Sequence, residues 1–210
     1  RRAHLEEDAG KLFHREDRSL VDLNRAGVPL LEIVTERDIQ SADEAFAFLT
    51  QLRTLVRYLG ISTGDMEKGA MRCEPNISLP PVGSATLGTR IEIKNLNSLR
   101  AVRAGLAYEI ERQENVLAAG GKVQPMTMGW DEKRSVTFCQ RSKETAADYR
   151  YFPEPDLPPL IIAQEWVETV RSQLPELPEL KKTRFMASYG LSTYDADVLV
   201  ADKKVADFYE

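Results

Sequence analysis

Residues 41–60 have the clearest helical pattern in the chain. Ser41 followed by Glu44 matches the capping box that begins many helices, apolar residues then recur at helical spacing, and Gly60 is placed to end the helix. The segments on either side alternate between apolar and polar residues with a period of two, which is typical of strands. A chain with both patterns must combine helices and strands, so we expect an α+β fold.

The expected strands are short and are separated by glycine and by turn-forming residues. Alternation is clear in the later ones, where apolar side chains fall on one side and charged or amide side chains on the other. The expected strands cover residues 3–8, 20–23, 29–36, 71–79 and 89–96.

The second half of the chain changes from mixed structure to helices alone. A second helix is expected over residues 98–119 and a hairpin over 123–141, and a proline-rich run follows. Residues 179–189 and the last twenty residues have helical patterns. We place a domain boundary near Pro175, with a mostly antiparallel sheet and its helices over residues 1–174 and the start of an all-helical domain over 175–210.

Composition excludes several classes of protein. The chain of 210 residues has a formal net charge of −5, which argues against a surface dominated by phosphate contacts. No run approaches the roughly 18 apolar residues of a membrane helix, and the first residues lack the apolar region of a signal peptide, so we expect no membrane span and a cytoplasmic protein. Because Arg1 is not an initiator methionine and the ends lie inside patterned segments, we expect an internal piece of a longer chain.

Familiar catalytic motifs are absent from the sequence. It has no phosphate-binding P-loop, nucleophile elbow, His-Glu-x-x-His zinc motif or dinucleotide fingerprint. Cys73 and Cys139 are too far apart to suggest a zinc site, and we expect two reduced thiols. His4 and His14 are the only histidines, so a nucleophile with a histidine base has little support.

Two carboxylates lie where the pattern predicts apolar surroundings. Glu7 shares its side of a strand with Leu5, and Glu32 shares its side with Leu30 and Val34. A buried carboxylate needs a cation, a hydrogen-bond network or a proton. A pairing with a nearby arginine, or a position on an edge strand where the alternation means little, is one explanation. The other is a Mg²⁺ site, since Mg²⁺ takes one or two carboxylates that converge from neighbouring strands.

The polar sides of the two later strands have both charges on what we expect to be one sheet surface. A solvated antiparallel face with cross-strand pairs would explain this mixture. A cleft that handles phosphate would explain it equally well, because carboxylates hold metal there and basic groups neutralise a transferred phosphoryl group. The residues concerned are Arg72, Glu74, Asn76, Arg90, Glu92 and Lys94.

Several strings in the sequence are more specific than their periodicity. HLEEDAGK at residues 4–11, SLVDLNRAGVPLLEIV at 19–34 and EIKNLNS at 92–98 closely resemble the family of amidotransferase B subunits, known as GatB. DYRYFPEPD at 148–156 and LPELP at 174–178 resemble it too. The matches run in the expected order over essentially the whole chain, although the run at 148–152 suggests no role beyond packing.

The resemblance implies a fold and a function. Residues 1–174 would be the later part of a cradle-shaped catalytic domain, and the remainder the start of a helical domain. Members of this family phosphorylate the side-chain carboxylate of Glu-tRNA(Gln) or Asp-tRNA(Asn) with ATP and Mg²⁺. Ammonia from the glutaminase, which is the A subunit, then forms the amide, and the C subunit completes the heterotrimer. There are two alternatives. The chain could belong to the related archaeal E subunit, or it could be a fragment that only docks the glutaminase.

The resemblance also implies site residues. Glu7 and Glu32 match two acidic positions that hold Mg²⁺ in the family. Glu74 is a third candidate ligand, although Cys73-Glu74-Pro75-Asn76 departs from the usual Cys-Asp-Ala-Asn. The family's N-terminal metal-binding segment is absent, so we expect this chain to lack the complete site. The expected contacts to ATP or the acyl phosphate are Arg25, Arg72, Lys94 and Asn95; the alternative for each is a structural role in a salt bridge or a turn.

Overall fold

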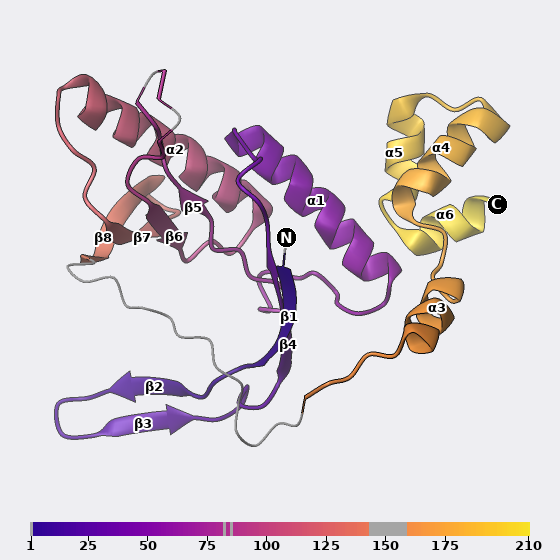
Figure 1. The fold of residues 1–210 in the computed structure, drawn as a ribbon, viewed down its shortest axis with the longest axis horizontal. Helices are drawn as coiled ribbons and strands as arrows, with labels where there is room; N and C mark the ends of the chain where they lie inside the picture. The colour runs from indigo at the N-terminus through magenta and orange to yellow at the C-terminus, as the bar shows by residue number, and fades with distance from the viewer. Residues whose placement is uncertain (1, 82, 85, 143–158) are drawn as a thin grey trace. The chain divides into compact units, whose positions relative to one another are not determined.

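The computed structural model describes residues 2–81, 83–84, 86–142 and 159–210 (Figure 1). It has both helices and strands, which confirms the predicted α+β class. The chain divides into two compact units, Arg1–Gln40 and Ser41–Glu210. This division does not coincide with the predicted boundary at residue 175, and that boundary stays a prediction.

The first unit consists of two antiparallel ribbons. Strand β1 (Arg2–Glu7) pairs with β4 (Pro29–Val34), and β2 (Lys11–His14) pairs with β3 (Ser19–Asp22). Three of these strands were predicted, whereas β2 was not. Among the described residues none before Ala45 is buried, so the unit has no core of its own.

The second unit begins with the predicted helix. Helix α1 (Ala42–Tyr58) is capped by Ser41, whose Oγ accepts a hydrogen bond of 3.1 Å from the backbone N–H of Glu44. Gly60 follows the helix with a φ of 69°, a left-handed conformation that glycine adopts at little cost. The predicted capping chemistry is therefore confirmed at both ends of the helix.

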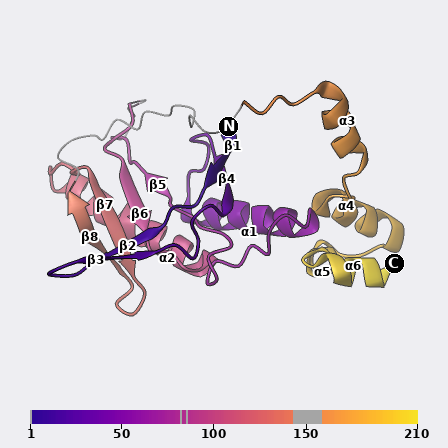
Figure 2. The same ribbon diagram turned by 90° about the horizontal axis from the view of Figure 1, so that it is seen from below.

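After α1, the second unit continues with a four-stranded sheet and a second helix, α2, that packs on it (Figure 2). The sheet has the order β5-β6-β7-β8, in which β6 and β7 are parallel and the other pairs antiparallel. Helix α2 connects the two parallel strands. The bounds are Asn76–Ile77 for β5, Ile91–Lys94 for β6, Leu99–Ala118 for α2, Met126–Asp131 for β7 and Val136–Ser142 for β8.

The main core lies between one face of this sheet and helices α1 and α2. Ile93 and Trp130 from the sheet pack with Val102 and Leu106 of α2 and with Leu49 of α1. The other face of the sheet has polar side chains. The strand predicted over residues 71–79 shrinks to two residues in β5, because only these form ladder pairs with β6.

Among the described residues after β8, the second unit has the helices α3 (Gln164–Ser172), α4 (Pro178–Tyr189), α5 (Thr193–Val200) and α6 (Lys203–Tyr209). Phe185 of α4 is fully buried against α5 and α6. The hydroxyl of Tyr58 at the end of α1 donates a 2.8 Å hydrogen bond to the carbonyl of Val200, which ties α1 to α5. Within the described residues, none of the helices combines the length and the apolar character that crossing a bilayer requires.

Candidate functional site

One face of the β1–β4 ribbon brings a histidine and two carboxylates together. His4 lies directly opposite Glu32 in the ladder, and Glu6 follows two residues after His4 on the same side. The Nε2 atom of His4 is 2.6 Å from Oε1 of Glu6 and 3.2 Å from Oε2 of Glu32. Each residue offers one ligand atom, and these atoms all lie within 4.8 Å of one another.

This cluster is accessible to a solvated ion. The side chains of His4, Glu6 and Glu32 are 27%, 40% and 41% exposed. Arg2 approaches from the same side, with its Nη2 3.1 Å from Oε2 of Glu32, and supplies positive charge to the carboxylates. Two carboxylate oxygens suit a hard divalent cation, and an imidazole beside them can serve as a ligand or orient a carboxylate.

The register contradicts the expected convergence of Glu7 and Glu32. Glu7 lies opposite Pro29 and one residue beyond Glu6, so its side chain points to the other face of the ribbon. The carboxylate that meets Glu32 is Glu6. Glu6 was not predicted because it shares its side of β1 with the polar residues Arg2 and His4, and only the pairing register shows that this side meets Glu32.

Arg25 belongs to a turn of the first unit. Its Nε donates a 2.8 Å hydrogen bond to Oδ2 of Asp8, which is 12% exposed. The backbone N–H of Gly27, at a φ of 77°, donates to the carbonyl of Asp8 over 2.9 Å. The turn therefore holds Arg25 beside Asp8, the residue that follows Glu7 in the chain, and Asp8 is its carboxylate partner.

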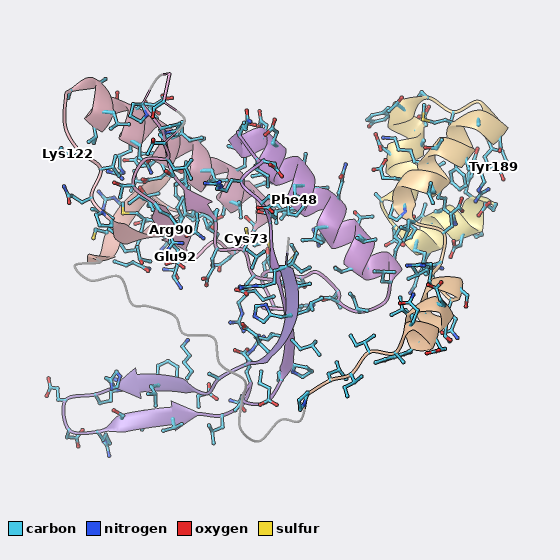
Figure 3. All side chains as sticks on the ribbon, in the orientation of Figure 1. Phe48, Cys73, Arg90, Glu92, Lys122 and Tyr189 are labelled. Carbon is cyan, nitrogen blue, oxygen red and sulfur yellow. The ribbon has the colours of Figure 1, made fainter. Side chains whose placement is uncertain are left out.

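A second polar cluster lies on the open face of the four-stranded sheet. The Nζ atom of Lys94 is 3.1 Å from Oε2 of Glu74 and 3.5 Å from Oε1 of Glu92. Thr127 donates to Oε2 of Glu92 over 3.4 Å. Figure 3 labels Glu92, together with Arg90, on this part of the unit. The predicted residues Glu74 and Lys94 thus meet on one face.

Charge on this face stabilises the lysine as a cation. Burial acts to lower the pKa of Lys94, but the hydrogen bond with Glu74 and the charges of Glu74 and Glu92 outweigh it and raise the pKa above its ordinary value. Lys94 therefore carries a positive charge at neutral pH with a carboxylate on either side. Such an arrangement can neutralise a phosphate group that displaces one of the carboxylates.

The remaining predicted residues flank this face. Arg72 is exposed on the segment before β5 and makes interactions within the structure. Asn95 follows β6 with a φ of 63°, a left-handed conformation that asparagine tolerates better than most residues, and its side chain is exposed. The predicted residues thus fall into two groups, with Glu7, Arg25 and Glu32 in the first unit and the others in the second.

A fully buried carboxylate, Glu109 on α2, was not predicted from the sequence. It accepts hydrogen bonds from Arg112, from Gln113 over 2.9 Å and from Thr137 over 3.1 Å. The hydrogen bonds to Glu109 raise the pKa of Arg112. Because these partners satisfy the carboxylate inside the fold, Glu109 is a structural group and not part of either cluster.

Comparisons with known proteins show the family of this chain. The model of the GatB/GatE catalytic domain matches residues 1–168. The curated relatives include B subunits of the aspartyl/glutamyl-tRNA(Asn/Gln) amidotransferase. That of Elusimicrobium minutum is 54% identical over 209 residues, and those of Thermoanaerobacter sp. and Thermotoga maritima are each 52% identical.

The alignments with these three relatives include 100% of this chain and 44–45% of each relative. The chain therefore spans less than half the length of the relatives that it matches. A family match over residues 1–168, together with identity above half along the whole chain, is more than a shared fold would give. The chain belongs to the GatB/GatE catalytic domain family.

Proposed function

We propose that this chain is part of a tRNA-dependent amidotransferase subunit that uses ATP to phosphorylate the side-chain carboxylate of Glu-tRNA(Gln) or Asp-tRNA(Asn). Ammonia then attacks the carbonyl carbon, phosphate leaves, and the amide of Gln-tRNA(Gln) or Asn-tRNA(Asn) is formed. The ammonia comes from the glutaminase, the A subunit, with the C subunit in the same heterotrimer, in the cytoplasm. The names of the relatives, which are subunits of an amidotransferase for these tRNAs, support this proposal.

The chemistry requires activation because a carboxylate is a poor acyl donor. Attack by ammonia on the free carboxylate would have to expel an oxide, whereas an acyl phosphate expels phosphate. The protein must therefore place the γ-phosphate of ATP in line with the carboxylate and neutralise the charge that spreads over the transferred group.

Glu6 and Glu32 are the proposed ligands of a Mg²⁺ ion, with His4 beside them. Their oxygens lie on one face and within reach of a single ion, and the donor set fits a cation that also keeps water and phosphate oxygens as ligands. A bound Mg²⁺ would supply positive charge to the phosphates of ATP. His4 and Arg2 keep the carboxylate of Glu32 oriented by contacts of 3.2 and 3.1 Å. Glu7 is left out of this set.

Lys94 is the proposed contact to the transferred phosphate or to ATP. It is charged and partly buried, and it is already flanked by two carboxylates. Glu74, the third carboxylate proposed to bind metal, would release Lys94 when phosphate binds. Arg25, Arg72 and Asn95 are the other proposed contacts to ATP or to the acyl phosphate.

The observation that carries the proposal is the meeting of Glu6 and Glu32 beside His4 in a chain of this family. The test uses the complete amidotransferase complex and measures glutamine-dependent conversion of Glu-tRNA(Gln) together with ADP release. We expect Glu6→Gln and Glu32→Gln to lower both rates by roughly 10- to 100-fold and to raise the Mg²⁺ concentration required for half-maximal activity.

Glu7→Gln is the matched control, since it makes the same change one residue away on the opposite face of β1. We expect this variant to stay within about twofold of the wild-type rate. A large loss of activity in Glu7→Gln with normal activity in Glu6→Gln would show that the site lies on the other face of β1. ADP release that is independent of all three carboxylates would refute the proposed activation site.

A further inference from the structure

Three residues on adjacent strands form a line across the open face of the four-stranded sheet. Lys94 of β6 pairs with Gly129 of β7, and Gly129 pairs with Phe138 of β8. Residues directly opposite each other in a ladder point to the same face of the sheet. The lysine and the phenyl ring therefore lie on one face with a glycine between them.

The glycine makes room for the phenyl ring. A Cβ atom at Gly129 would lie 2.6 Å from Cζ of Phe138 and 2.6 Å from Nε2 of Gln140, closer than such contacts occur. The ring of Phe138 and the amide of Gln140 thus extend over the bare backbone of β7. A register shift between Thr127 and Met128 accompanies this arrangement and gives β8 an irregular stretch at Gln140.

Phe138 is not part of the core. The opposite face of the sheet is the one that packs, through Ile93, Met128 and Trp130, whereas Phe138 is 42% exposed. Other side chains on this face are polar: they include Lys94, Gln140 and the hydrogen-bonded pair of Thr127 and Glu92. An aromatic ring that is open to solvent on a polar sheet face is well suited to stack on a flat ligand.

We propose that Phe138 is the platform on which the adenine base of ATP stacks, with the phosphates directed toward Lys94. Two strand spacings separate Phe138 from Lys94, about 10 Å, which is comparable to the extent of the ribose and phosphates of a nucleotide. The amide of Gln140 lies beside the ring and can donate to or accept from an edge of the base. This inference rests on the proposed use of ATP and assigns the part of the sheet that recognises the base.

The test compares ATP with inorganic tripolyphosphate, which has the phosphates but no base. Binding of each is measured by calorimetry in the complete amidotransferase complex. We expect Phe138→Leu to raise the Kd for ATP roughly 5- to 150-fold and to leave the Kd for tripolyphosphate unchanged, because stacking is lost and the phosphate contacts remain. Phe138→Tyr should bind ATP like the wild type.

Gly129→Ala provides a second test that keeps the ring. The added methyl must displace Phe138 and Gln140, whose nearest atoms are the ends of flexible side chains, so the fold should persist while ATP binding weakens. Phe208→Leu is the matched control, because Phe208 is an exposed phenylalanine on α6, outside the sheet. It should bind both ligands normally, and thermal unfolding would confirm that all variants fold.

The outcomes separate the two proposals. Equal ATP affinity in wild type, Phe138→Leu and Gly129→Ala would overturn the stacking site and leave the proposed function standing. Parallel losses for ATP and tripolyphosphate would also overturn it, as would a change confined to the KM for aminoacyl-tRNA. If the wild-type complex bound neither ATP nor tripolyphosphate, both proposals would fail.

Discussion

The two cysteines differ in their surroundings and should differ in reactivity. Cys73 packs against the core of the second unit, and this burial, together with the nearby charge of Glu74, raises its pKa to about 11. Only the thiolate is nucleophilic, so roughly one thousandth of Cys73 would be reactive at pH 8. We expect a thiol reagent to label exposed Cys139 quickly and Cys73 hardly at all in the folded protein.

The variant Cys139→Ser isolates the buried thiol for this measurement. It should show almost no labelling under native conditions and one reacting thiol in denaturant, as followed by mass spectrometry. The variant Cys73→Ser is the control and should label as fast as the wild type. Rapid native labelling of Cys139→Ser would show that Cys73 is accessible and that its thiolate is not suppressed.

At the scale of elements, Glu109 links helix α2 to strand β8. Its carboxylate receives hydrogen bonds from Arg112 and Gln113 on the helix and from Thr137 on the strand. Removing a buried carboxylate leaves these donors without their partner. We expect Glu109→Ala to lower the free energy of unfolding by about 3 kcal/mol, measured by urea denaturation.

Glu111 provides the matched control for this change. It lies two residues along the same helix and is exposed. Glu111→Ala should alter the free energy of unfolding by no more than about 0.5 kcal/mol. Similar effects of the two substitutions would mean that the loss comes from helix charge and not from the buried hydrogen bonds.

The helices were predictable because their signals are local. Ser41 is the N-cap of α1 as predicted, Gly60 follows the end of that helix, and α2 begins directly after Ser98, where its helix was expected to start. Strand pairing joins residues that are far apart in the sequence, and it determines which side chains meet at the candidate site. The alternation around Glu7 and Glu32 can be read along each strand, but only the register shows that Glu32 faces His4 and that Glu6 takes the expected place of Glu7.

At the scale of the whole molecule, charged groups join the helices of the C-terminal part. Lys181 of α4 is 5% exposed, and its Nζ lies 2.6 Å from Asp207 of α6 and 3.1 Å from Glu210. Arg184 pairs with Glu176 over 2.7 Å and also contacts Glu210. These contacts hold the ends of α4 and α6 together around the buried Phe185.

The network makes the stability of these helices depend on pH. Hydrogen bonds from Lys181 and Lys203 hold the pKa of Asp207 below its ordinary value, and a hydrogen bond from Arg184 does the same for Glu176. A carboxylate whose pKa is lower in the folded state stabilises the fold above its unfolded pKa, about 4 for these groups. That stabilisation is lost as the pH falls through the lower, folded pKa.

We therefore expect the difference in stability between the wild type and Asp207→Asn to be present at pH 7 and to shrink as the pH falls below about 4. At low pH the wild-type carboxylate is protonated and resembles the amide, so the substitution no longer removes a charge. Thermal unfolding of the full-length protein over a series of pH values measures this difference. Asp17→Asn, at a side chain that is 74% exposed in the first unit, is the control and should show little difference at any pH. A difference for Asp207→Asn that did not change as the pH fell would show that ionisation of Asp207 does not contribute to the stability of these helices.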